Sequence, residues 1–119
     1  MKENVIQEKS YRFAIEIVET FRLIWKKEPV LAKQLLRSGT SIGANVEEAI
    51  GAQSRKDFFS KMTIAYKEAR ETLYWIRLLI DTHYLESDPG QRLKNSCEEL
   101  IRIIGSIQKS LKNSVEVAE

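Results

Sequence analysis

Prolines and glycines divide this chain into four stretches of similar length, and each stretch repeats its apolar residues every three or four positions. Only two prolines and five glycines occur in 119 residues, and Pro29, Gly51 and the pair Pro89–Gly90 fall between the periodic stretches. Such a period is typical of amphipathic α-helices. Short connections force successive helices to run antiparallel. The sequence therefore predicts an all-α fold, an antiparallel up-down-up-down four-helix bundle. We expect the chain to form one domain over residues 1–119, with helices at about 7–27, 30–50, 55–83 and 89–112.

The first expected helix carries two apolar stripes side by side. The stripe expected to form its core seam has steps of three and four and consists of Tyr11, Ala14, Val18, Phe21 and Trp25. The second stripe consists of Phe13, Ile17 and Ile24.

Local signals mark the helix ends. Ser54 is expected to cap the start of the third helix, and Asp88, followed by proline, the start of the fourth. Gly51 is expected as a left-handed cap after the second helix.

The chain has more apolar surface than one bundle core requires. A bundle helix needs roughly three apolar positions in seven. The first and third helices exceed this, and the surplus suggests either a very wide core or an interface between copies of the chain. We predict the interface, formed by Phe13, Ile17, Ile64, Trp75 and Leu78.

Small residues are concentrated in the second helix. Gly39 and Gly43 are four apart and therefore share one helical face, where each costs about 1 kcal/mol of helix propensity relative to alanine. Close approach of another helix would offset that cost. We expect tight helix packing at Ser38, Gly39, Gly43 and Asn45; docking of a ligand or peptide on this bare face, or a helix kink, are the alternatives.

The net charge of +2 exerts no strong pull on a polyanion, so a nucleic-acid surface would depend on clustered charge. The best cluster lies on the third helix and consists of Lys56, Lys67, Arg70, Tyr74 and Arg77. Glu68 and Glu71 stand close by in the sequence. The cluster is therefore either an RNA-binding stripe or a surface that is simply solvated or forms salt bridges between subunits.

The sequence offers no recognisable catalytic or metal site. His83 is the only histidine and Cys97 the only cysteine, too few for a zinc site or for the Glu-x-x-His pairs of a di-iron bundle. Cys97 lies on the apolar seam of the fourth helix, where we expect a core residue with a raised pKa. We expect no cofactor. The lone cysteine and the lack of an apolar run of spanning length predict a cytoplasmic protein without a membrane segment.

Three segments carry a family resemblance. They are Leu35-Leu-Arg-Ser-Gly-Thr-Ser-Ile-Gly-Ala-Asn-Val-Glu-Glu-Ala, then Ser54-Arg-Lys-Asp-Phe-Phe, then the run that ends in Trp75-Ile76. With them the chain resembles, from about Ser10 to Leu111, the four-helix-bundle family also called the S23 ribosomal protein or 23S rRNA intervening-sequence protein family. Many relatives carry a proline near Gly43, which this chain lacks.

The resemblance implies a homopentameric ring and an RNA context, because members are named for genes within insertions in 23S rRNA genes. Accessory proteins of diversity-generating retroelements are similar in fold and work with a reverse transcriptase. No active site is attached to the family.

We therefore expect a non-enzymatic homo-oligomeric scaffold, with itself and RNA or an RNA-associated protein as partners. The alternative is a protein-only adaptor without nucleic-acid binding. An enzyme would require a site assembled between subunits.

Overall fold

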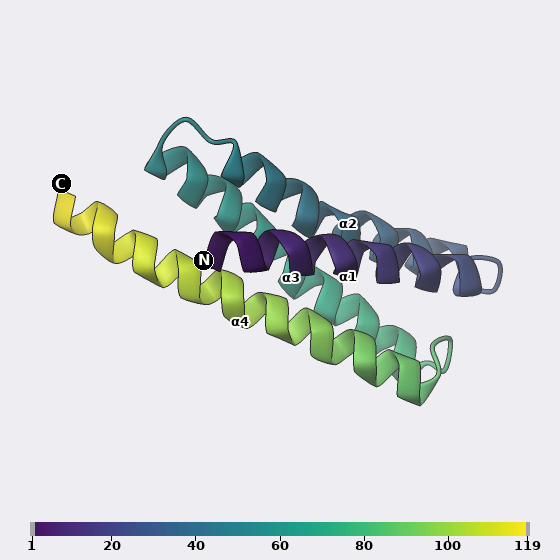
Figure 1. The fold of residues 1–119 in the computed structure, drawn as a ribbon. Helices are drawn as coiled ribbons and strands as arrows, with labels where there is room; N and C mark the ends of the chain where they lie inside the picture. Colours follow the sequence, from purple (N-terminus) through teal and green to yellow (C-terminus); the bar gives the residue numbers. More distant parts are fainter. Residues whose placement is uncertain (1, 119) are drawn as a thin grey trace.

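The computed structural model describes the backbone of residues 2–118 and the side chains of residues 5–113. Along that backbone the chain forms four α-helices and no strand, which confirms the predicted all-helical class. The helices pack side by side as an elongated bundle of 51 × 21 × 20 Å (Figure 1). They are α1 (Lys2–Ile24), α2 (Pro29–Ile50), α3 (Arg55–Asp81) and α4 (Ser87–Ala118). None of these helices, over the described residues, is long and apolar enough to cross a membrane.

The starts of α2 and α3 follow from local chemistry. Pro29 is the first residue of α2, where its missing N–H costs nothing. The hydroxyl of Ser54 accepts a hydrogen bond from the N–H of Asp57 at 3.0 Å, as its N-cap position predicts. The prediction of Asp88 as the cap of α4 is wrong, because α4 begins at Ser87, two residues before the predicted start at 89, and Asp88 lies in its first turn.

Other helix ends also differ from the prediction, either in position or in backbone conformation. Gly51 does end α2, but with φ −87° it is not left-handed. The left-handed residue is His83 in the α3–α4 connection, with φ 66°. At the chain ends, α1 begins at Lys2 and stops at Ile24, and α4 continues to Ala118.

Contacts between neighbouring helices step in opposite directions along the two partners. Along α1 and α2, Ser10 lies against Gly43 and Ile17 against Gly39. The same order holds for α2 and α3, where the Thr72 hydroxyl donates to Ser38 at 2.9 Å and Lys61 pairs with Glu48 at 3.1 Å. It also holds for α3 and α4, through Ala69 with Cys97 and Thr63 with Gln108. Helix α1 also packs on α4, more sparsely than it packs on α2.

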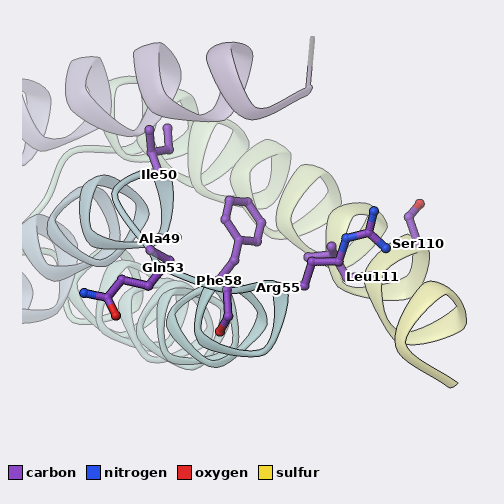
Figure 2. Close-up of a pocket in the computed structure, with 9 residues that line it drawn as sticks. Ala49, Ile50, Gln53, Arg55, Phe58, Ser110 and Leu111 are labelled. Carbon is purple, nitrogen blue, oxygen red and sulfur yellow. The ribbon is translucent and has the colours of Figure 1, made fainter. Parts of the chain in front are cut away.

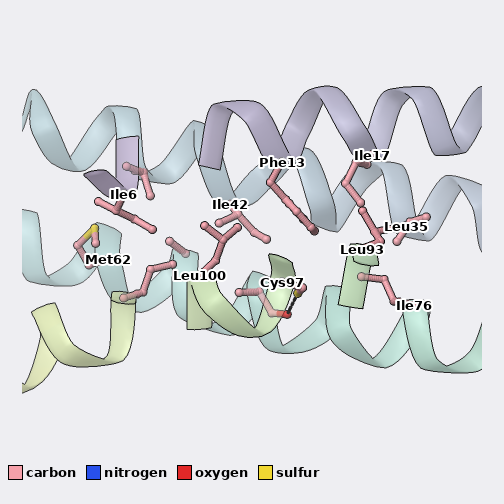
Figure 3. Packing of buried hydrophobic residues seen from close by; sticks show 14 of the residues in the cluster. Ile6, Phe13, Ile17, Leu35, Ile42, Met62, Ile76, Leu93, Cys97 and Leu100 are labelled. Atoms are coloured by element: carbon pink, nitrogen blue, oxygen red, sulfur yellow. Dashed lines mark hydrogen bonds between the residues drawn. The ribbon is translucent and has the colours of Figure 1, made fainter. Parts of the chain in front are cut away.

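The core runs along the bundle axis and takes apolar side chains from all four helices (Figure 3). Helix α1 contributes Ile6, Phe13, Ile17 and Ile24, which we call the inner stripe. The seam predicted for this helix is therefore wrong, because Tyr11 is 65% exposed and Trp25 is also exposed. The neighbouring exposed or half-buried residues Tyr11, Ile15 and Val18 form what we call the outer stripe.

Candidate interaction surfaces

Glycine on α2 decides which face of α1 is buried. A Cβ atom at Gly39 would stand 2.7 to 2.9 Å from three side-chain atoms of Ile17, and one at Gly43 would stand 3.2 Å from the carbonyl oxygen of Ser10. Both distances are too short or very tight for a carbon contact. The two glycines therefore let the α1 backbone approach α2, and the small-residue face is filled by α1 rather than left open for a ligand.

The other two residues predicted for tight packing are placed differently. Ser38 is fully buried; its hydroxyl donates to the Gln34 carbonyl at 3.0 Å and accepts from Thr72 of α3. Asn45 is half-buried, and its amide donates to the carbonyl and hydroxyl of Ser41 within its own helix. Ser38 thus joins two helices, whereas Asn45 bonds to Ser41 of its own helix.

Two of the five residues predicted for an interface between copies lie inside the protomer. Phe13 is 2% exposed and Ile17 is 0% exposed, so the prediction is wrong for both. The physical reason is the close α1–α2 approach described above, which turns the inner stripe into the core. Ile64 is exposed on α3, whereas Trp75 and Leu78 are half-buried.

The exposed apolar surface of α1 is the outer stripe. Tyr11 is 65% and Ile15 is 46% exposed, and with Val18 they line a shallow groove that Glu19 and Arg22 complete. An exposed apolar strip with charged residues at its edge is typical of a contact surface. Sequence reasoning did single out Tyr11 and Val18, but as core residues.

The basic cluster of α3 lies on the outside of the bundle. Lys56, Lys67, Arg70, Tyr74 and Arg77 are all exposed; we call them the α3 face. No ion pair within the described side chains involves any of the four cations.

The two nearby glutamates face α2 and leave these cations unmatched. Glu68 pairs with Arg37 of α2 at 3.4 Å, and Glu71 pairs with the same guanidinium and accepts from Trp75 Nε1 at 2.9 Å. Within the described side chains the cluster therefore forms no salt bridge to its acidic neighbours, because Arg37 of α2 engages both glutamates. Both interpretations of the cluster, an RNA-binding stripe and a solvated face, stay predictions.

Helix α4 extends the basic surface beyond the predicted residues. Gln108 of α4 donates to the Thr63 hydroxyl of α3 at 3.1 Å, and Gly105 lies beside the Tyr66 ring. Lys94 and Lys112 lie on the same side of α4, at helical steps of three and four through Glu98, Ile101, Gly105 and Gln108, so this side also carries one carboxylate. That periodicity was readable in the sequence but did not show which side of α4 faces α3.

The ionisable groups in the interior and grooves offer little chemistry. Cys97 is fully buried and its thiol lies 3.3 Å from the Ala69 carbonyl. Burial, and to a lesser extent Glu98, raises the pKa of this thiol to about 12, so it is protonated at neutral pH. In a groove between α1 and α4, partial burial and then Glu19 raise the pKa of Glu16. Among the described residues no three metal-ligating side chains gather.

A second hollow lies where the α2–α3 connection meets α4 (Figure 2). Phe58 of α3 and Leu111 of α4 form its apolar part, and Arg55 supplies its only charged side chain. The hollow is open, and its remaining lining is small or uncharged.

Within the described residues, the chain is a small all-helical protein with a packed interior, an apolar outer stripe on α1 and a cationic outer face on α3. The family model described as 23S rRNA-intervening sequence protein matches residues 2–106. The chain therefore belongs to this family, as the resemblance predicted. It is also similar to a solved protein of unknown function from the S23 ribosomal protein family of Bacteroides thetaiotaomicron VPI-5482. The two are 46% identical with a TM-score of 0.87, over 92% of this chain and 99% of that one. No curated protein matches the chain.

Proposed function

We propose that this chain is a non-enzymatic scaffold that self-associates through the outer stripe of α1 and binds RNA through the α3 face. Its protomer is the antiparallel up-down-up-down bundle, and its partners are other copies of itself and RNA or an RNA-associated protein in the cytoplasm. The family name, which refers to 23S rRNA, supports an RNA context.

The unmatched cations of α3 are the observation that carries the RNA assignment. Phosphate groups bind clustered Lys and Arg side chains, and binding releases counterions. Cations already paired with carboxylates would lose those pairs on binding. Here Arg37 neutralises Glu68 and Glu71, whereas Lys67 and Arg70 have no carboxylate partner among the described side chains.

The outer stripe supports self-association. Tyr11 and Ile15 place aromatic and aliphatic surface in water, and burial of such surface is worth roughly 25 cal/mol per Å². In a ring, every copy would present one α3 face, and several weak contacts on one RNA would add to a high avidity. The pentamer itself rests on the family resemblance.

Light scattering behind a sizing column measures the assembly directly. We expect a mass of about five times the 13.8 kDa of one chain. A mass of 13.8 kDa would remove self-association from the proposal, together with the avidity derived from it.

Fluorescence anisotropy with a labelled RNA at rising salt tests the RNA assignment. Wild type should lose affinity steeply as salt rises. The double variant Lys67→Glu and Arg70→Glu should lose binding at low salt. Lys27→Glu with Lys33→Glu makes the same change in net charge on exposed residues elsewhere and should bind as wild type does.

Two results would contradict this assignment. Equal losses in the two double variants would show that net charge alone attracts RNA. No binding by wild type at low salt would favour the protein-only adaptor.

A further inference from the structure

The α3 face carries one aromatic ring, that of Tyr74, among its cations. Tyr74 is 54% exposed, with Lys67 and Arg70 seven and four residues before it and Arg77 three residues after it. These spacings keep all four side chains on one side of the helix. Along the helix axis the three cations span about 15 Å, at roughly 1.5 Å per residue. An exposed tyrosine thus lies between cations that have no carboxylate partner among the described side chains.

The Tyr74 ring is in contact with the side chain of Trp75. The Trp75 ring meets it edge to face, with ring centroids 5.0 Å apart and an interplanar angle of 72°. Trp75 is fixed in turn by its hydrogen bond to Glu71, which Arg37 of α2 also holds. A ring positioned before the ligand arrives loses little conformational entropy on binding. These contacts connect Tyr74 through Trp75 and Glu71 to Arg37 of α2.

The cationic surface around Tyr74 continues across the seam onto α4. Ala69 of α3 contacts Cys97 of α4, and the two helices run antiparallel. Arg77, which follows Ala69 in the chain, and Lys94, which precedes Cys97, therefore lie toward the same end of the pair. At the other end, Lys112 lies one turn beyond the Gln108 that bonds Thr63. An extended polyanion along the seam would meet lysines and arginines of both helices, together with one carboxylate, that of Glu98 on the same side of α4.

We infer that the ligand of this surface is single-stranded RNA, with its phosphates along the α3–α4 seam and one unpaired base stacked on Tyr74. This inference rests on the proposed RNA-binding function. In a duplex the bases are stacked on one another and only their edges are reachable. In a single strand each base offers a face, and surfaces that bind single strands combine a cationic track with exposed aromatic rings. The α3 face has both components.

The experiment compares Tyr74→Leu with Tyr74→Phe. The probe is a fluorescein-labelled RNA of about 16 nucleotides without self-complementarity, used alone and annealed to its complement. Wild type should bind the single strand more tightly than the duplex. Tyr74→Leu should weaken single-strand binding by about fivefold or more, because one stacked base contributes about 1 kcal/mol or more. Tyr74→Phe keeps the ring face and should bind within about twofold of wild type.

The salt dependence separates stacking from phosphate binding. Tyr74→Leu should leave the slope of log K against log salt unchanged, because no phosphate contact is lost, whereas Lys67→Glu with Arg70→Glu should make the slope shallower. Circular dichroism verifies that each variant is folded.

The outcomes distinguish the two proposals. If wild type binds RNA through Lys67 and Arg70 but Tyr74→Leu binds equally well, or the duplex binds as tightly as the single strand, the stacking inference is overturned and the RNA-binding function stands. If wild type binds neither RNA at low salt, both fall.

Discussion

The two apolar stripes of α1 have similar composition and spacing, yet one is buried and the other is exposed. The inner stripe, with Phe13 and Ile17, is in the core, whereas Tyr11 and Ile15 of the outer stripe are 65% and 46% exposed. Nothing in α1 itself makes this choice. The partner helix makes it, because Gly39 and Gly43 of α2 form a surface into which Ile17 and the Ser10 backbone fit. The amphipathic pattern of one helix therefore does not determine which of its faces is buried.

The largest effect on stability is expected at the inner stripe. Ile17→Ala should lower the free energy of unfolding by about 2–5 kcal/mol, because it removes buried methyl groups and leaves a cavity over Gly39. Urea unfolding followed by circular dichroism measures the loss. Leu23→Ala on the exposed side of the same helix is the control and should change stability by about 0.5 kcal/mol or less. Equal losses would show that α1 docks through a different face.

A smaller effect is expected when the glycine surface itself is altered. Gly39→Ala forces the buried Ile17 side chain to move, which costs about 1–3 kcal/mol, while alanine returns about 1 kcal/mol of helix propensity. We expect a net loss of about 1 kcal/mol in urea unfolding.

The Gly39→Ala loss should be coupled to Ile17. In the double variant with Ile17→Val, part of it should be recovered, since the smaller side chain makes room. At Gly51 a Cβ would meet only ordinary contacts at 3.9 Å, so Gly51→Ala should be close to neutral. Strictly additive losses at positions 39 and 17 would argue against a direct contact.

The smallest effect on folding is expected at the outer stripe, where assembly should change instead. Ile15→Arg should alter the folding stability of the protomer by about 0.5 kcal/mol or less, because this position is exposed. It should reduce the mass in light scattering to the 13.8 kDa of one chain, because a charge would be buried in the interface. Leu23→Arg, exposed outside the stripe, should leave the mass unchanged. An Ile15→Arg protein that keeps its full mass would remove the outer stripe as the interface.

Features encoded within one helix were the ones that the sequence predicted well. The helix count, the start of α2 at Pro29 and the Ser54 cap depend on neighbouring residues alone. The buried position of Cys97 followed from the regular period of α4. The start of α4 was missed by two residues, because helix starts depend on backbone geometry that several polar residues can satisfy.

Features that depend on a second helix were predicted less well. The sequence places Glu68 and Glu71 beside the basic cluster, and only the packing of α2 shows that Arg37 takes both of them. The α4 lysines were missed for the same reason, because their relation to α3 depends on the register of the two helices. The five residues of the α3 face were named correctly as exposed neighbours, while their RNA-binding role stays a prediction.

The arrangement of the helices also bears on how fast the chain folds. Each helix packs chiefly on the next one along the chain, and only the sparse α1–α4 contact joins distant segments. Proteins dominated by such local contacts have low contact order and fold within microseconds to milliseconds. We predict that the α2–α3 hairpin, the most extensive of these pairs, forms first during folding. The α1–α4 contact is then expected to form last during folding. Because it is the sparsest contact, local opening of the native bundle is expected to begin there.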